Sequence, residues 1–203
     1  MILALDSAAS VGSVALVQAG KVVRDVRIET PRGRGGALFS ALEDVLRDSP
    51  PLRGVVAGTG PGSYNGIRSA LGAAWGIARA REVPFWGISS LLALASGEYL
   101  AVGDARRGQY YGARVREGVF QEPPVLWNRE DLEGWLGNHT DLPIYVPAAL
   151  EFLPAAVVVT PSAVRLALLA EDRGPDRTLP EPLYLKPAHI TTARGERPVG
   201  GGK

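Results

Sequence analysis

The sequence has no cysteine and only two histidines among its 203 residues. Without cysteine, disulfides, thiolate nucleophiles and Cys-ligated zinc are excluded. The two histidines, His139 and His189, have no carboxylate or second histidine at helical metal-binding spacing, and no Gly-x-Ser-x-Gly elbow accompanies the serines. We therefore expect neither a metal site nor a catalytic triad.

An excess of one charge and a long hydrophobic run are also missing. The 22 Lys and Arg balance 21 Asp and Glu, so the net charge is +1, and any contact with nucleic acid must be local. No segment approaches a membrane span, which needs about 18 uninterrupted apolar residues. The chain enters a strand-like pattern directly at Met1. We expect a folded, cytoplasmic protein without membrane association.

Apolar runs separated by turns predict an antiparallel meander of three strands at the N-terminus, over residues 2–5, 13–18 and 21–28. Apolar residues at helical spacing then predict a helix over 38–46, which a Pro-Pro pair ends. A buried strand at 54–58 follows. The pattern is typical of an α/β domain.

A glycine-rich segment, Gly58–Gly66, separates that strand from a long helical pattern from Ile67 to about Arg81. A further strand is predicted at 85–88, and a short helix capped by Ser89 or Ser90 follows it. The order of strand, glycine loop and helix is typical of loops that can bind anions.

The second half repeats the beginning of the first. Residues 101–104 and 110–113 echo residues 3–6 and 13–16, because each pair reads as a strand ending in aspartate, a turn and a returning strand. Beyond the repeat we expect helices at 129–136 and 164–169 and strands at 143–146 and 157–160. We therefore expect an N-terminal lobe over 1–97, a smaller C-terminal lobe over 98–190 and a flexible tail over 191–203.

The two aspartates of this repeat, Asp6 and Asp104, are the obvious catalytic candidates. At the ends of equivalent strands they could hold a metal–phosphate complex across a cleft, as in nucleotide phosphotransferases. The alternative is that each satisfies backbone donors of its own turn, which is a frequent role of Asp. On the residues alone the second interpretation is favoured.

Further candidates for a nucleotide or phosphate site flank these aspartates. Gly60 and Gly62 could expose backbone N–H groups to an anion, but no Walker motif or dinucleotide spacing accompanies them. Plain turn glycines are at least as well supported. The remaining candidates are Ser7, Arg68 and Arg106, and for the arginines surface solvation is the simpler expectation.

The helix over 67–81 carries small residues at steps of three and four, namely Ser69, Gly72 or Ala73, Gly76 and Ala80. A glycine in a helix interior costs about 1 kcal/mol, so two of them need a compensating reason. Close approach of another helix supplies one, from within this chain or from a partner. The candidate interface comprises Phe39, Leu46, Ser69, Leu71, Gly72, Trp75 and Gly76, and Trp75 is of a type that dominates interface hot spots.

Five segments in order resemble the TsaB (YeaZ-like) family. They begin with Ile2–Ser7 and the glycine-rich Gly58–Arg68, which is the most specific. Gly87–Leu91, Asp104–Tyr111 and Glu181–Pro187 complete the set. The family's usual start of the first helix is replaced here by Arg32–Gly36, so within residues 31–40 we expect the helix to start later and the loop before it to be looser.

This resemblance implies a fold of two actin-like, RNase H-like (ASKHA) lobes, each a mixed sheet flanked by helices. It implies a non-catalytic dimerisation subunit for a TsaD-type enzyme, which makes threonylcarbamoyladenosine at position 37 (t6A37) of tRNAs reading ANN codons. Implied partners are the TsaD-like subunit, a TsaE-like ATPase in the larger complex and, when alone, a second copy, with tRNA contacted only indirectly. No resident cofactor is implied, and ADP or ATP at the subunit junction stays open.

Two other interpretations stay open beside the interaction subunit. The first is a small-substrate kinase or ATPase using Asp6 and Asp104, although residues 120–203 offer no second strong phosphate loop. The second is a peptidase, which lacks both metal ligands and a triad and ranks last.

Overall fold

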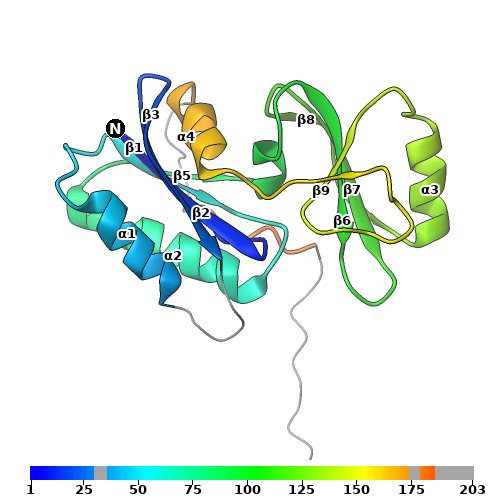
Figure 1. Ribbon diagram of the computed structural model, residues 1–203, viewed down its shortest axis with the longest axis horizontal. Helices are drawn as coiled ribbons and strands as arrows, with labels where there is room; N and C mark the ends of the chain where they lie inside the picture. The colour runs from blue at the N-terminus through cyan, green and yellow to red at the C-terminus, as the bar shows by residue number, and fades with distance from the viewer. Residues whose placement is uncertain (30–35, 174–178, 186–203) are drawn as a thin grey trace, which may run out of the picture.

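The computed structural model describes residues 1–29, 36–173 and 179–185 and places two five-stranded sheets side by side (Figure 1). The stretch at 30–35, which includes most of the basic segment before the first helix, and the expected tail at 191–203 lie outside the described residues. No helix in the described ranges is long and apolar enough to cross a bilayer.

The first sheet begins with the predicted antiparallel meander and continues with two parallel strands. Its order is β3-β2-β1-β4-β5, and β1 pairs antiparallel with β2 and parallel with β4. The central β1 and β4 are fully buried and read as continuous apolar runs, as strands covered on both faces do. The strands are β1 (Ile2–Asp6), β2 (Val11–Gln18), β3 (Lys21–Glu29), β4 (Gly54–Gly58) and β5 (Phe85–Ile88).

The second sheet has the same topology. Its order is β10-β9-β6-β7-β8, again an antiparallel meander extended by parallel strands. The internal repeat read from the sequence is therefore confirmed. The strands are β6 (Glu98–Asp104), β7 (Tyr110–Arg116), β8 (Val119–Trp127), β9 (Ile144–Val146) and β10 (Val157–Val158).

Helices α1 (Ala37–Leu46) and α2 (Tyr64–Arg81) lie next to each other on one face of the first sheet (Figure 1). Buried side chains of both helices join one apolar core with the sheet. Helix α2 begins at Tyr64, three residues before the predicted start, because the Ser63 hydroxyl accepts a hydrogen bond from the Gly66 N–H and caps the first turn.

Helix α4 (Ala163–Glu171) covers the opposite face of the first sheet, although it lies within the residues expected to form the C-terminal lobe. It contacts β1, β2 and β4. Its start is tied to β2, since the Ser13 hydroxyl accepts from the Ala163 N–H at 2.8 Å and donates to the Pro161 carbonyl at 3.3 Å. The chain therefore returns to the first lobe after completing the second.

One apolar core connects the two lobes. It combines buried residues of the first sheet, of the short 3₁₀ helix η1 (Ser90–Ala93), of α4 and of the inner face of the second sheet. Each of these elements contributes fully buried side chains, such as Ala4 of β1, Leu166 of α4 and Tyr99 of β6. Helix α3 (Arg129–Gly137) covers the outer face of the second sheet, where Leu132 and Leu100 belong to a separate cluster. The lobes are thus joined by apolar packing as well as by the chain.

Candidate functional site

Asp6 is enclosed at the end of β1. Its side chain is 0% exposed, and its carboxylate accepts from the Ala8 N–H at 2.8 Å and from the Ser90 hydroxyl at 2.5 Å. The same Ser90 oxygen accepts from the Gly60 N–H at 3.0 Å. Burial raises the pKa of Asp6, and the two hydrogen bonds oppose this rise only in part. Ser90, for which the sequence predicts only a role as a helix cap, is therefore a side-chain partner of Asp6, and Ser89 is the residue that caps η1.

The glycine loop presses against this carboxylate. A Cβ on Gly58 would lie 1.7 Å from Asp6 Oδ2, which no side chain can accommodate without moving the acid. A Cβ on Gly60 would meet Ile67 at 2.5 Å, and Gly60 has a φ of +91° that favours glycine. Pro61, which follows through a cis peptide bond, is buried. Gly58 therefore leaves the room that the Asp6 carboxylate occupies, and Gly60 leaves the room that the Ile67 side chain occupies.

The loop after β1 and the start of α2 also pack on each other. The Ser7 hydroxyl donates to the Gly66 carbonyl at 2.7 Å, and a Cβ on Gly66 would lie 1.9 Å from the Ser7 carbonyl oxygen. A Cβ on Gly62 would lie 2.2 Å from the Ala8 carbonyl oxygen. The backbone of Ser7 and Ala8 therefore lies directly against Gly66 and Gly62.

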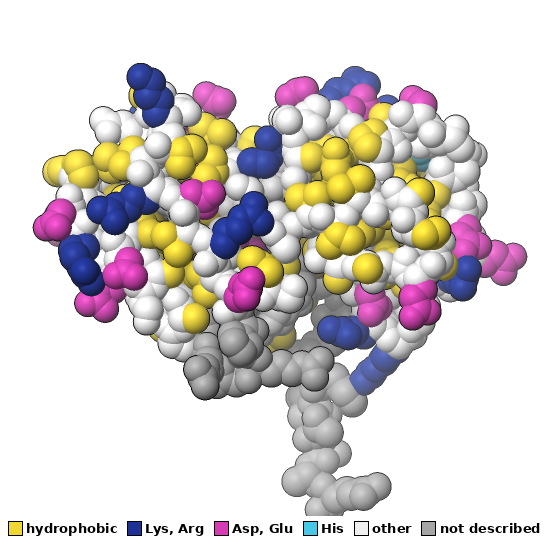
Figure 2. Space-filling view, viewed as in Figure 1, with side chains coloured by type: hydrophobic (Ala, Val, Ile, Leu, Met, Phe, Trp, Pro, Cys, Tyr) yellow, Lys and Arg dark blue, Asp and Glu magenta, His cyan; other side chains and the backbone are white. Residues whose placement is uncertain are grey.

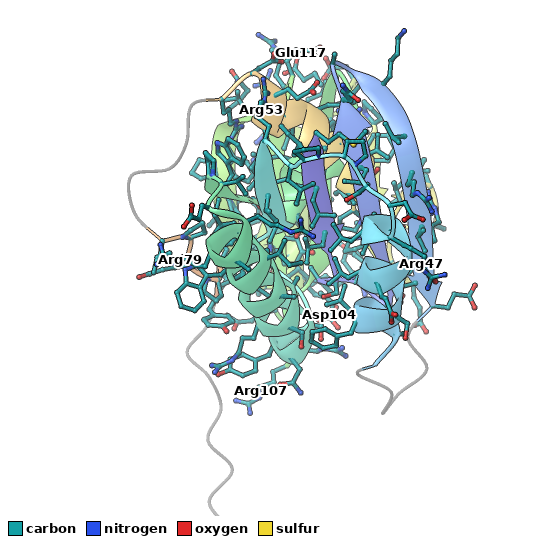
Figure 3. The ribbon with its side chains drawn as sticks, turned by 90° about the vertical axis from the view of Figure 1, so that its left-hand side faces the viewer. Arg47, Arg53, Arg79, Asp104, Arg107 and Glu117 are labelled. Carbon is teal, nitrogen blue, oxygen red and sulfur yellow. The ribbon has the colours of Figure 1, made fainter. Side chains whose placement is uncertain are left out.

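Asp104, the counterpart of Asp6, lies in an exposed turn. Its carboxylate accepts from the Arg106 N–H at 2.6 Å, and the Arg106 guanidinium lies 4.0 Å away from it. Arg106 and Arg107 both have left-handed backbone angles, with φ of +68° and +58°. Figure 3 shows Arg107 projecting outward at this end of the molecule. Both aspartates thus bond the backbone two residues ahead.

No group of three or more potential metal ligands occurs in the parts of the chain that the structure describes. Acidic and basic side chains are interspersed over the face shown in Figure 2, in agreement with the near-zero net charge. Of the candidate phosphate residues, Asp6, Ser7, Gly60 and Gly62 come together at the end of the first sheet. Asp104 and Arg106 lie in the β6–β7 turn of the second lobe.

Arg68 lies on the first turns of α2 beside two tyrosines. It donates to the Tyr64 hydroxyl at 2.8 Å, and its guanidinium carbon lies 5.2 Å from the centre of the Tyr64 ring. Tyr64 in turn stacks on Tyr184 from the C-terminal segment, with ring centres 5.1 Å apart. The interaction with Tyr64 is the largest contribution that raises the pKa of Arg68. Arg68 is therefore placed by aromatic contacts on the surface.

The outer face of α2 carries the small residues that the sequence singled out. Gly72 and Gly76 are exposed, and a Cβ at either position would meet nothing within 4 Å. Trp75 between them is 46% exposed, and Ser69 is exposed as well. Among the described residues, nothing from this chain covers that ridge. Leu71 differs, because it is 8% exposed and belongs to the core below α2.

Helix α1 adds an exposed aromatic ring to the same side of the molecule. Phe39 is 57% exposed, whereas Leu46 is partly buried against the core. Figure 3 looks onto this side, with α2 in front and α1, which ends just before the labelled Arg47, beside it. The exposed candidate residues Phe39, Ser69, Gly72, Trp75 and Gly76 therefore belong to two neighbouring helices.

The repeated strand order, with helices on the faces of each sheet, defines a two-lobed protein of the actin-like, RNase H-like class, as the resemblance implied. Two solved structures share the fold. A Pseudomonas aeruginosa protein described as similar to peptidase YEAZ has a TM-score of 0.72 at 22% identity, covering 91% of this chain and 99% of that one. YeaZ from Pseudomonas aeruginosa has a TM-score of 0.63 at 21% identity, covering 84% and 90%.

Sequence comparison adds the family. The profile described as TsaD: tRNA N6-adenosine threonylcarbamoyltransferase matches residues 37–121. The tRNA threonylcarbamoyladenosine biosynthesis protein TsaB of Escherichia coli is 31% identical over 147 residues, which are 66% of this chain and 62% of that protein. An uncharacterized Mycobacterium tuberculosis protein is 30% identical over 197 residues and is matched over 91% of both chains. The chain belongs to the TsaB/YeaZ family.

Proposed function

We propose that this protein is a non-catalytic subunit that binds and supports a TsaD-type threonylcarbamoyltransferase in t6A37 modification of tRNA in the cytoplasm. The observation that carries the proposal is the pair Gly72 and Gly76, which face open space on α2. Each costs about 1 kcal/mol of helix stability relative to alanine. The described part of the chain gains no packing from them, and close approach of a partner helix would supply a reason for their presence.

The side chains around the two glycines support the same use. A ridge of small residues lets two helix axes approach closely. The exposed Trp75 on the same helix and Phe39 on the neighbouring α1 each offer a large apolar surface. A second copy of this chain could use the ridge when the partner is absent. A TsaE-like ATPase joins the larger assembly in this proposal, and tRNA is contacted through the other subunits.

The environment of Asp6 favours this role over that of a kinase or ATPase. A carboxylate that holds a metal–phosphate complex must face a space that admits the ligand. Asp6 instead faces Ser90 and the Gly58 backbone, and burial raises its pKa.

The test is light scattering coupled to size-exclusion chromatography, on this protein alone and mixed with the TsaD-type protein of the same organism. We expect a complex of the two proteins, and we expect Gly72→Glu or Gly76→Glu to prevent it. Gly134→Glu is the matched control, because Gly134 is also exposed, helical and free of neighbours within 4 Å, but lies on α3 of the other lobe. The proposal is wrong if no complex forms, or if the α2 variants still bind like the control.

A further inference from the structure

The segment Leu179–Leu185, here called the C-terminal strap, crosses the end of the first sheet. The Leu183 N–H donates to the Thr59 carbonyl at 2.8 Å, directly after β4. Pro180 packs on Gly87 of β5, where a Cβ would lie 2.3 Å from the Pro180 Cβ. Gly87 therefore leaves the room that the strap needs.

The strap ends its described course on α2. Tyr184 stacks on Tyr64 at an interplanar angle of 23°, and Leu185 packs on the core between the lobes. A backbone hydrogen bond, a glycine contact and an aromatic stack thus fix the strap. These contacts join it to β4, β5 and α2, more than 90 residues earlier in the chain.

The stack extends the exposed ridge of α2. Residues three or four apart in a helix lie on one face, and steps of four, four and three lead from Tyr64 through Arg68 and Gly72 to Trp75. In spite of the stacking, Tyr64 is 43% and Tyr184 is 40% exposed. Half-exposed tyrosines held in place by a neighbour offer apolar area and a hydroxyl group with little loss of side-chain entropy on binding.

We propose that the C-terminal strap is part of the partner-binding surface, and that Tyr184 contacts the same TsaD-type protein that binds the α2 ridge. The inference rests on the proposed function above. It is supported by the position of the strap, because the tyrosine pair and Arg68 lie at the start of the helix face that carries Gly72 and Trp75. Among residues 1–29, 36–173 and 179–185, Arg68 forms no ion pair with a carboxylate, and its guanidinium bonds the Tyr64 hydroxyl instead.

The test compares Tyr184→Ala with Leu179→Ala in binding to the TsaD-type protein by isothermal titration calorimetry. Leu179 belongs to the same strap and is 64% exposed, so its replacement controls for changes that spare the stack. We expect Tyr184→Ala to raise the Kd about tenfold or more, as loss of an interface tyrosine does. Leu179→Ala should stay within about twofold, as most interface-edge changes do. Tyr184→Phe, which keeps the ring, should bind more tightly than Tyr184→Ala.

Each outcome has a separate meaning. If wild-type protein binds the partner and Tyr184→Ala binds equally well, the strap inference is wrong and the proposed function stands. If wild-type protein does not bind, both are wrong. If Tyr184→Ala weakens only self-association, the strap serves a second copy of this chain, and the proposal as stated is overturned. Unchanged melting temperatures of the variants are required for the comparison.

Discussion

Asp6 and Asp104 end the equivalent strands β1 and β6 and each accept a hydrogen bond from the N–H two residues ahead, at 2.8 and 2.6 Å. Their surroundings are opposite. Asp6 is 0% exposed and bonds Ser90, whereas Asp104 lies in an exposed turn with Arg106. Both aspartates therefore keep the same hydrogen bond within their turns, while only the carboxylate of Asp6 is enclosed by protein.

The enclosed Asp6 gives the stability of the protein a predictable dependence on pH. Burial raises its pKa above the usual value of 3.8, so the acid binds a proton more tightly in the folded than in the unfolded chain. The stability that this tighter proton binding contributes is fully present below the pKa of Asp6 in the unfolded chain. It is lost as the pH rises through the pKa of Asp6 in the folded chain. We expect Asp6→Asn, measured by urea unfolding, to gain stability relative to wild type as pH rises from about 4.

The control for this measurement is Asp104→Asn, which removes the same charge from the equivalent but exposed turn. If the difference between Asp6→Asn and wild type does not grow with pH, the pKa of Asp6 is not raised. ATP hydrolysis by the isolated protein that disappears in Asp6→Asn is the result that would restore the kinase interpretation.

Replacing the α2 glycines by alanine should have opposite effects on the stability of the isolated chain and on its association with a partner. Gly72→Ala and Gly76→Ala meet nothing within 4 Å, so each should stabilise the isolated chain by about 0.5–1 kcal/mol through helix propensity. The same methyl groups should weaken the complex with the TsaD-type protein, because they separate the helices. Thermal unfolding of the dilute protein and a binding titration measure the two effects.

Gly134→Ala on α3 separates the effect of helix propensity on stability from the effect of the added methyl group on partner binding. It should stabilise the chain similarly and leave binding unchanged, since α3 covers the outer face of the other lobe. Equal binding by all three alanine variants would show that α2 has no close helix partner.

Local patterns predicted much of this fold. The meander of β1, β2 and β3, the buried β4 and the repeat at β6 and β7 follow from alternation and turn residues that act within a few positions. Strand β8 is not among the predicted elements, and it contains Pro123 and Pro124. It accommodates them as the edge strand of its sheet, where a missing N–H costs little.

Long-range contacts were beyond the sequence. Nothing in the local pattern connects Asp6 with Ser90, or the strap residue Tyr184 with Tyr64, because these pairs depend on how distant segments meet. The sequence also left open whether Trp75 packs inside the chain, and its 46% exposure answers that for the described residues. Its role with a partner stays a prediction.

Gly87→Ala should release the C-terminal strap without unfolding the first sheet. The added Cβ would lie 2.3 Å from Pro180 and 2.9 Å from the Thr59 methyl carbon, so the strap must move away. Hydrogen exchange of the Leu183 amide, which donates to Thr59, should then quicken about tenfold or more, as expected for local opening. Exchange in β4 should stay as in wild type, and an unchanged Leu183 rate would contradict the docking described here.

The shared core predicts that both lobes unfold together. Leu166 of α4 is 0% exposed in the core that joins the two sheets, so Leu166→Ala should cost about 2–5 kcal/mol. Two single-tryptophan variants report the lobes separately, one retaining Trp86 of β5 and the other Trp135 of α3. Their unfolding curves in urea should coincide, and Leu166→Ala should shift both equally.

Leu132→Ala is the control that distinguishes one unit from two, because Leu132 is equally buried but belongs to the cluster under α3 alone. In a single cooperative unit it must also shift both curves, since neither lobe unfolds without the other. If it shifts only the Trp135 curve, the lobes unfold independently. In that case the apolar core between the lobes contributes too little free energy to couple their unfolding, and the lobes are free to rotate against each other as two rigid bodies.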